Sequence, residues 1–197
     1  YYSWARSDTI IRHPELFNLW KQAGLDTLFV GLESVDDTRL AAYNKSNATQ
    51  NNIKAVRMLR ELDINLHAAF IVDPDFTEAD FDRMEEEIFA VSPAEIAFTV
   101  LTPTPGSALW QQSDKQFLID PYLYSDCFHT LKEPRLSIKR FYQRYGRLTA
   151  LALRNNPLRI NRVRMPVGDF AKAFVRGVRY IIAHHTLHRD YPAEIRR

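Results

Sequence analysis

Two apolar runs of the sequence break into residues that could bind a ligand. The run beginning at Leu28 ends in Gly-Leu-Glu-Ser, which places the carboxylate of Glu33 and the hydroxyl of Ser34 at its end. A later run ends in Thr-Pro-Thr-Pro-Gly at 102–106. Carboxylates and hydroxyls hydrogen-bond amines, riboses and other polar ligand groups. Because ligands bind beyond the carboxyl ends of parallel strands, we expect function at these two places.

Two other polar features follow apolar runs. Lys45 lies on the loop after the first run, where it could meet a carboxylate or phosphate as a point charge. Asp73-Pro74-Asp75 follows a third run and could orient a substrate. Each feature alone also suits a structural role: Glu33 a cap or salt bridge, Lys45 a solvated surface lysine, and Asp73 a turn. Taken singly, the structural roles are favoured.

The three runs predict three parallel strands, adjacent in chain order, at Thr27–Leu32, Leu66–Val72 and Glu95–Leu101. Their apolar residues are continuous rather than alternating, which is typical of strands buried on both faces of a parallel sheet. The segments between them are long enough for the helices that parallel crossovers require. Three strands are too few to close a barrel, so one sheet edge should be exposed or covered by a neighbouring chain.

Helical patterns occupy the remaining segments. Thr77 and Asp80 match a capping pattern at the start of one helix. In another, Ile53, Val56 and Leu59 are spaced as one buried stripe. The predicted helices span about 13–23, 38–43, 51–62, 77–90, 108–112, 137–154 and 167–185.

The charge of the chain is divided unevenly. Residues 130–197 hold 16 Lys and Arg against 4 Asp and Glu, a net charge of +12, whereas the chain as a whole carries only +2. The helix over 167–185 is amphipathic and basic. It could lie on an anionic membrane, or dock on another part of the protein, which is slightly favoured. No recognised motif supports nucleic-acid binding.

Cysteine usage and the chain ends limit the protein class. With Cys127 as its one cysteine, the chain forms no internal disulfide and has no CxxxCxxC cradle for a metal cluster. No apolar run approaches the roughly 20 residues that span a bilayer. The start has no initiator Met and no signal-peptide pattern. We therefore expect the middle of a longer cytoplasmic protein, with membrane association left open.

Taken in order, these features resemble the second half of the catalytic domain of radical S-adenosylmethionine (SAM) enzymes. The run Phe-Ile-Val-Asp-Pro-Asp-Phe at 70–76 is similar to the cobalamin-binding members of the hopanoid C-3 methylase-like group. The resemblance covers about residues 8–150. The motifs that carry it are Gly31-Leu32-Glu33-Ser34, Asn44-Lys45, the run 70–77, Asp80-Phe81, the run 101–107, Leu109-Trp110, Asp126…His129 and Phe141-Tyr142…Tyr145.

The resemblance implies an α/β fold, the C-terminal half of a partial (β/α)6 TIM-like barrel, followed by basic α-helices. Strands four to six would be present in this chain. An upstream CxxxCxxC loop would hold a [4Fe-4S] cluster whose open iron binds SAM, and a further domain would bind cobalamin. Because that cysteine loop is missing here, the resemblance implies a fragment that is silent alone and binds none of these cofactors tightly. Its partner would be the missing N-terminal portion of the same protein.

The resemblance also assigns site residues. Glu33 and Ser34 fall where strand-four residues approach the methionine and ribose of SAM, and Lys45 falls near the basic contact to its carboxylate. Asp73 stands in place of a Gly-x-Pro-Gly-Glu type of ending. Thr99 and Thr102 fall at strand six, near the adenine or the substrate. His67 is expected to be structural and Cys127 to be a buried or incidental thiol. We expect Glu33, Ser34, Lys45, Asp73 and Thr102 to converge at one end of the sheet.

These expectations divide the chain into the barrel half, residues 1–112, and a mostly helical basic extension, residues 113–197. The expected function is a fragment of a cobalamin-dependent radical SAM C-methyltransferase that acts on a lipid or other apolar substrate. The first alternative is a radical SAM oxidoreductase or cyclase without methyl transfer. The second is a non-catalytic α/β module whose basic tail binds a membrane or partner.

Overall fold

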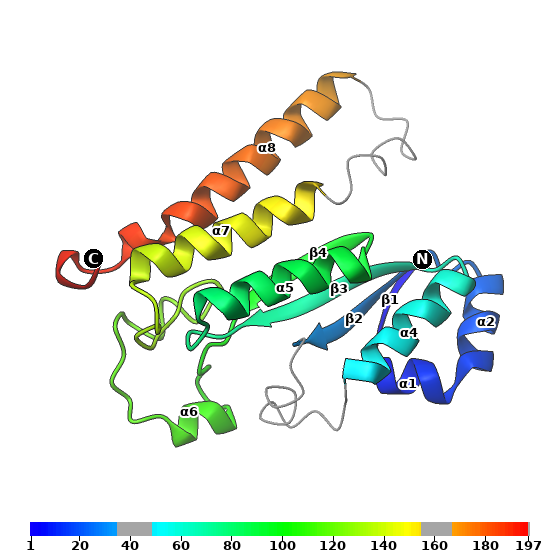
Figure 1. Cartoon of the computed structure of the whole chain (residues 1–197), viewed down its shortest axis with the longest axis horizontal. Coiled ribbons are helices and arrows are strands. Elements are labelled where there is room, and N and C mark those ends of the chain that lie inside the picture. Colours follow the sequence, from blue (N-terminus) through cyan, green and yellow to red (C-terminus); the bar gives the residue numbers. More distant parts are fainter. Residues whose placement is uncertain (35–48, 155–166, 197) are drawn as a thin grey trace. The chain divides into compact units, whose positions relative to one another are not determined.

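The computed structural model describes residues 1–34, 49–154 and 167–196 and contains a parallel sheet. Its strands lie in chain order (Figure 1). Strands β1 and β2 pair in parallel, as do β2 and β3. The backbone bonds from Ala94 to Leu66 and from Leu101 to Val72 continue the same direction to the fourth strand. The strands are β1 (Tyr2–Ala5), β2 (Thr27–Glu33), β3 (Asn65–Val72) and β4 (Glu95–Val100).

The three predicted strands are confirmed in order and direction, and each bound is within one residue. The sequence-based expectation of three strands was nevertheless too low, because β1 adds a fourth at the edge of the described sheet. Its four residues, Tyr-Ser-Trp-Ala, alternate between exposed and half-buried. A strand this short and this little buried has no apolar run to mark it.

The expectation that both faces of the strands are buried is wrong. Along β2 the side chains of Leu28, Val30 and Leu32 are buried, whereas the alternate positions are half-exposed. Strand β3 alternates in the same way beyond Leu66. Over the described residues, side chains of the chain pack against one face of the sheet and leave the other partly open. Apolar residues lie on both faces, so the apolar runs alone do not distinguish the packed face from the open one.

Helices follow the strands. The Thr77 amide donates to the carboxylate of Asp80, and the Asp80 amide donates back to the Thr77 hydroxyl, so the predicted cap is confirmed. The predicted helix over 38–43 lies outside the described residues. The α-helices are α1 (Ser7–Arg12), α2 (Pro14–Gln22), α4 (Thr49–Glu61), α5 (Glu78–Val91), α6 (Ala108–Gln112), α7 (Ile138–Arg154) and α8 (Val167–Thr186). Two short 3-10 helices follow, Leu187–Asp190 and Ala193–Ile195.

The chain packs as two compact units. The first comprises residues 1–70 and 83–97, and the second comprises residues 71–82 and 98–197. Phe17, Val30 and Leu59 belong to the core of the first unit. The sequence-based division at residue 112 stays a prediction.

The second unit is built on helix α7, whose apolar side chains are almost fully buried. The Tyr145 hydroxyl donates to the carbonyl of Phe98, within β4, at 3.1 Å. Helix α8 packs beside α7 (Figure 1). Gly146 makes this close approach feasible, because a Cβ there would collide with the ring of His185.

Candidate functional site

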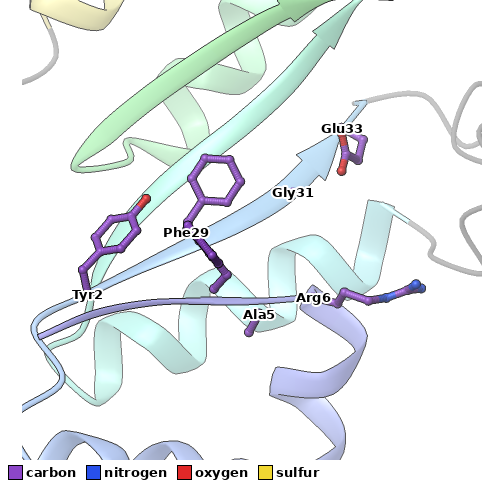
Figure 2. A pocket seen from close by; sticks show the side chains of 7 residues that line it. Tyr2, Ala5, Arg6, Phe29, Gly31 and Glu33 are labelled. Carbon is purple, nitrogen blue, oxygen red and sulfur yellow. The ribbon is translucent and has the colours of Figure 1, made fainter. Parts of the chain in front are cut away.

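An open cavity of about 750 Å³ lies in the first unit, at the face of the sheet that the helices leave uncovered. Figure 2 shows residues from β1 and β2 around it, with Glu33 at the strand end. It is the candidate ligand site of this unit. Its lining residues are Tyr2, Trp4, Ala5, Arg6, Phe29, Gly31 and Glu33.

The register of the strands explains the aromatic wall of the cavity. Tyr2 pairs with Thr27, and Trp4 pairs with Phe29, so their side chains project from the same face of the sheet. The Trp4 side chain is 73% exposed. An aromatic surface left open to this degree offers contact area and π faces to a ligand.

Glu33 is held over this face by a local irregularity in β2. The pairing of β2 with β3 shifts between Gly31 and Glu33, and the Glu33 backbone has a φ of +66°. Its carboxylate folds back over Gly31, where a Cβ would collide with it (Figure 2). The glycine and the β-bulge thus place a carboxylate at the edge of the aromatic wall.

Arg6 adds a cation to the same cavity. Its guanidinium donates to the carboxylate of Asp8 at 3.0 Å, and Arg12 donates to the same carboxylate at 2.6 Å. Burial alone would raise the pKa of Asp8, but the two arginines outweigh it and lower that pKa. Asp8 therefore stays ionised and holds the Arg6 side chain. The cavity combines a carboxylate, a guanidinium and aromatic faces, which suits a ligand that carries both charges.

Sequence reasoning identified Glu33 but missed the aromatic residues and Arg6. A signal was present, because Tyr2, Trp4 and Arg6 alternate as residues on one face of a strand do. Ser34 does not line the cavity. It is 3% exposed, and its amide donates to the carbonyl of Leu32 at 2.8 Å.

The other sequence-predicted residues lie in the second unit or outside the described chain. The Asp73 carboxylate accepts from the amide of Asp75 at 2.9 Å, as in a turn. The Thr102 hydroxyl lies 2.9 Å from the carbonyl of Val100 and 3.1 Å from that of His129. Thr99 is half-buried on β4. Lys45 lies outside the described residues. The convergence of these residues with Glu33 stays a prediction.

A second polar cluster in the second unit surrounds His129. Its Nδ1 lies 2.7 Å from the carboxylate of Asp126, and its Nε2 lies 3.0 Å from that of Asp190. Burial would raise the pKa of Asp126, but backbone bonds from Phe128 and His129 and the His129 ring outweigh it and lower that pKa. This cluster joins residues that are far apart along the chain.

Two further expectations concern single residues. His67 was expected to be structural, and its ring lies 3.1 Å from the carboxylate of Glu95 and 3.2 Å from the hydroxyl of Tyr2. Cys127 was expected to be a buried or incidental thiol rather than a ligand, and its exposure rules out only the buried alternative. The Cys127 carbonyl accepts a hydrogen bond from the amide of Val100, the last residue of β4.

An iron–sulfur cluster is not matched by the donor set of this chain. A CxxxCxxC cradle needs three thiolates, and the sequence holds one cysteine. Within residues 1–34, 49–154 and 167–196, no group of three His, Cys, Asp or Glu side chains could hold a metal ion.

The chain is similar to known proteins over much of its length. Residues 2–88 match the family model of the radical SAM superfamily. The chain is 30% identical to the hopanoid C-3 methylase of Methylococcus capsulatus over 142 residues, which are 72% of this chain and 27% of that protein. It is 28% identical over 118 residues to the bacteriochlorophyllide d C-8(2)-methyltransferase of Chlorobaculum tepidum, covering 57% of this chain and 26% of that protein.

Two other similar proteins share a lower sequence identity with this chain. The anaerobic magnesium-protoporphyrin IX monomethyl ester cyclase of Synechocystis is 25% identical over 99 residues, 50% of this chain and 20% of that protein. The solved structure of the cobalamin-dependent SAM radical enzyme OxsB covers 78% of this chain and 23% of its own, with 19% identity and a TM-score of 0.43. The chain thus spans about a quarter of the length of these relatives. The residues that line the cavity lie within the segment 2–88 that matches the radical SAM superfamily model.

Proposed function

We propose that residues 1–112 are the second half of a radical SAM barrel and that the cavity holds the methionine part of SAM. The observation that carries this proposal is Glu33, folded over Gly31 beside an aromatic wall. The methionine part of SAM bears an ammonium, a carboxylate and a sulfonium. The cavity has a carboxylate, a guanidinium and aromatic faces, one partner for each of these groups.

Each residue of the cavity has a role in this proposal. Glu33 accepts hydrogen bonds from the ammonium, as a charge-assisted contact. Arg6, held by Asp8, pairs with the carboxylate, in addition to the contact expected from Lys45. Trp4 and Phe29 face the sulfonium, because aromatic faces attract cations. When bound beside a reduced iron–sulfur cluster, SAM supplies radical chemistry at an unactivated carbon. The cysteines for that cluster would come from outside this chain.

We further propose that the whole protein is a cobalamin-dependent C-methyltransferase with a lipid or other apolar substrate. Two relatives carry names of methyl-transferring enzymes, and one of these names a hopanoid. The second candidate is a cyclase or oxidoreductase without methyl transfer, which the relative named as a cyclase supports. Thr99 and Thr102 remain proposed contacts to the adenine or the substrate.

Calorimetry on the complete, anaerobically reconstituted protein tests the SAM site. Glu33→Ala should weaken SAM binding about 10- to 100-fold, because a hydrogen bond to a charged group contributes about 1.5–3 kcal/mol. The matched control is Glu61→Ala, which removes an exposed carboxylate at the end of α4. Unchanged affinity in Glu33→Ala would remove Glu33 from the SAM site.

A labelling experiment separates the two reaction types. SAM carrying a labelled methyl group is incubated with the reduced protein and a lipid extract from its host. A methyltransferase moves the label into an extractable product. Turnover of SAM with no label in any product would instead favour a cyclase or oxidoreductase.

A further inference from the structure

Helix α8 of the second unit presents an unusually apolar surface to solvent. Its inner side faces α7, where the His184 ring is 6% exposed and packs against the rings of Tyr145 and Phe128. Gly177 and Ile181 lie on the same side and are half-buried. On its other side, α8 carries apolar side chains that no other described residue buries.

The exposed side of α8 consists of two adjacent stripes. At helical spacing, Phe174, Val178 and Ile182 form one apolar row, and Val175 lies beside it. Phe174 is 64% exposed and Ile182 is 56% exposed. Next to this apolar stripe, on the side away from α7, lies a basic stripe of three exposed cations. These are Lys172, Arg176 and Arg179.

The charge of α8, and of the sequence just before it, favours an anionic partner. Asp169 is the one acidic residue between positions 154 and 179, and it pairs with Lys172 at 3.3 Å. The same stretch holds seven cations: Arg154, Arg159, Arg162, Arg164, Lys172, Arg176 and Arg179. The cores of protein–protein interfaces are depleted in charged residues, whereas helices that lie on membranes place cations beside their apolar face.

We propose that α8 lies on the surface of an anionic lipid membrane. Phe174, Val178 and Ile182 enter the boundary between headgroups and acyl chains, and the basic stripe binds lipid phosphates. None of the helices in the described parts of the chain is long and apolar enough to cross a membrane, so the contact is peripheral. The proposal rests on α8 alone and stands whether or not the cavity binds SAM.

Sedimentation with vesicles tests the proposal on the complete protein. It should bind vesicles of phosphatidylcholine and phosphatidylglycerol at low salt, bind pure phosphatidylcholine much less, and lose binding as salt is added. Replacing Lys172, Arg176 and Arg179 together by Gln should weaken binding about a hundredfold, since each cation near the surface contributes about fivefold. Phe174→Ser with Val178→Ser should weaken it about tenfold or more.

Matched controls remove the same chemistry elsewhere. Lys54, Arg57 and Lys139 are exposed on α4 and α7, and their joint replacement by Gln should leave binding within about threefold. Leu19→Ser, at an exposed position on α2, controls for the apolar change. Circular dichroism establishes that each variant is folded. Absence of vesicle binding at low salt, or equal binding by all variants, overturns the proposal. A change in oligomeric state of the serine variant without a change in vesicle binding also overturns it, and assigns the stripe to a protein interface.

Discussion

Among single residues, Glu33 combines a positive φ with a place in the cavity lining. A residue other than glycine in the left-handed region costs about 1–2 kcal/mol, and here the cost coincides with a carboxylate in a cavity. Strain of this kind persists where surrounding structure enforces it, often at a ligand site. Gly31 is the complementary residue, because only a missing side chain leaves room for the carboxylate.

Two substitutions separate strain from ligand binding. Gly31→Ala should displace the Glu33 carboxylate and weaken SAM binding about as much as Glu33→Ala does. Glu33→Gly should also lose SAM binding but raise the free energy of unfolding by about 1 kcal/mol, because glycine accepts the positive φ. Calorimetry and urea unfolding measure the two effects. If Gly31→Ala binds SAM normally, the close contact has no functional role.

Asp126 gives the molecule a pH dependence in acid. Its pKa is lower in the folded chain than in the unfolded one, so its contribution to stability is present above the unfolded value of about 3.9. That contribution is lost as the pH falls through the lower folded value. Asp126→Asn should reduce stability by about 1 kcal/mol at pH 7, a figure kept small because the carboxylate is partly exposed. The variant should also lose less stability than the unmodified chain as the pH falls below about 4.

Unfolding from pH 2 to pH 7 checks this expectation. Asp120→Asn is the matched control, because Asp120 accepts the amide of Tyr122 in a similar turn but contacts no histidine within the described residues. If both variants show the same dependence of unfolding free energy on pH, the pairing of Asp126 with His129 contributes no stability beyond that of the turn.

Between elements, the start of α5 is tied to α7 by arginines that differ in burial. The Arg144 side chain is buried, lies 3.1 Å from the carboxylate of Glu78 and 2.6 Å from that of Asp82, and stacks on the ring of Phe81. Arg140 pairs with Glu78 on the surface. The side-chain hydrogen bond from Arg140 and both nearby guanidinium charges lower the pKa of Glu78, although burial opposes them.

The two arginines should differ in their effect on stability. Arg144→Met should cost about 2–3 kcal/mol, toward the lower end for a broken buried pair because its carboxylate partners face solvent. Arg140→Met should cost at most about 1 kcal/mol, as an exposed pair does. Guanidinium unfolding of both variants gives the comparison, and equal costs would show that burial of Arg144 is not what matters.

The buried stripe of α4 shows how a helix can be predicted while its face is not. The sequence placed Ile53 in the stripe with Val56 and Leu59, but Ile53 is 46% exposed. Asn52 and Ala55 are buried instead. The Asn52 side chain donates to the carbonyl of Leu32 at 2.9 Å, so a polar residue occupies the inner face. Hydrophobicity alone cannot reveal that choice.

For the whole molecule, the cofactor chemistry depends on residues that this sequence does not supply. One cysteine cannot replace the three thiolates of a CxxxCxxC loop. Anaerobic reconstitution of the 197-residue chain with iron and sulfide should therefore give no [4Fe-4S] absorbance, and its affinity for SAM should be weak. Cys127→Ser is the control for adventitious iron. A stoichiometric cluster on the chain would contradict this account.

The sequence alone determined the local structure and the family. Apolar runs located three strands, and the spacing of Thr77 and Asp80 located a helix start. The ordered motifs indicated the radical SAM superfamily, whose family model matches residues 2–88. Each of these depends on residues close together along the chain, so each can be recognised from local pattern.

Only the tertiary structure decided which surfaces stay open. It added β1 as a neighbour of β2, brought Tyr2, Trp4 and Arg6 beside Glu33, and left the apolar row of α8 uncovered. The reason is physical: apolar residues recur at the same spacing along the sequence whether a helix, a ligand or solvent lies against their face. Strand pairing and the cover of each face follow from contacts between distant residues, which local sequence does not encode.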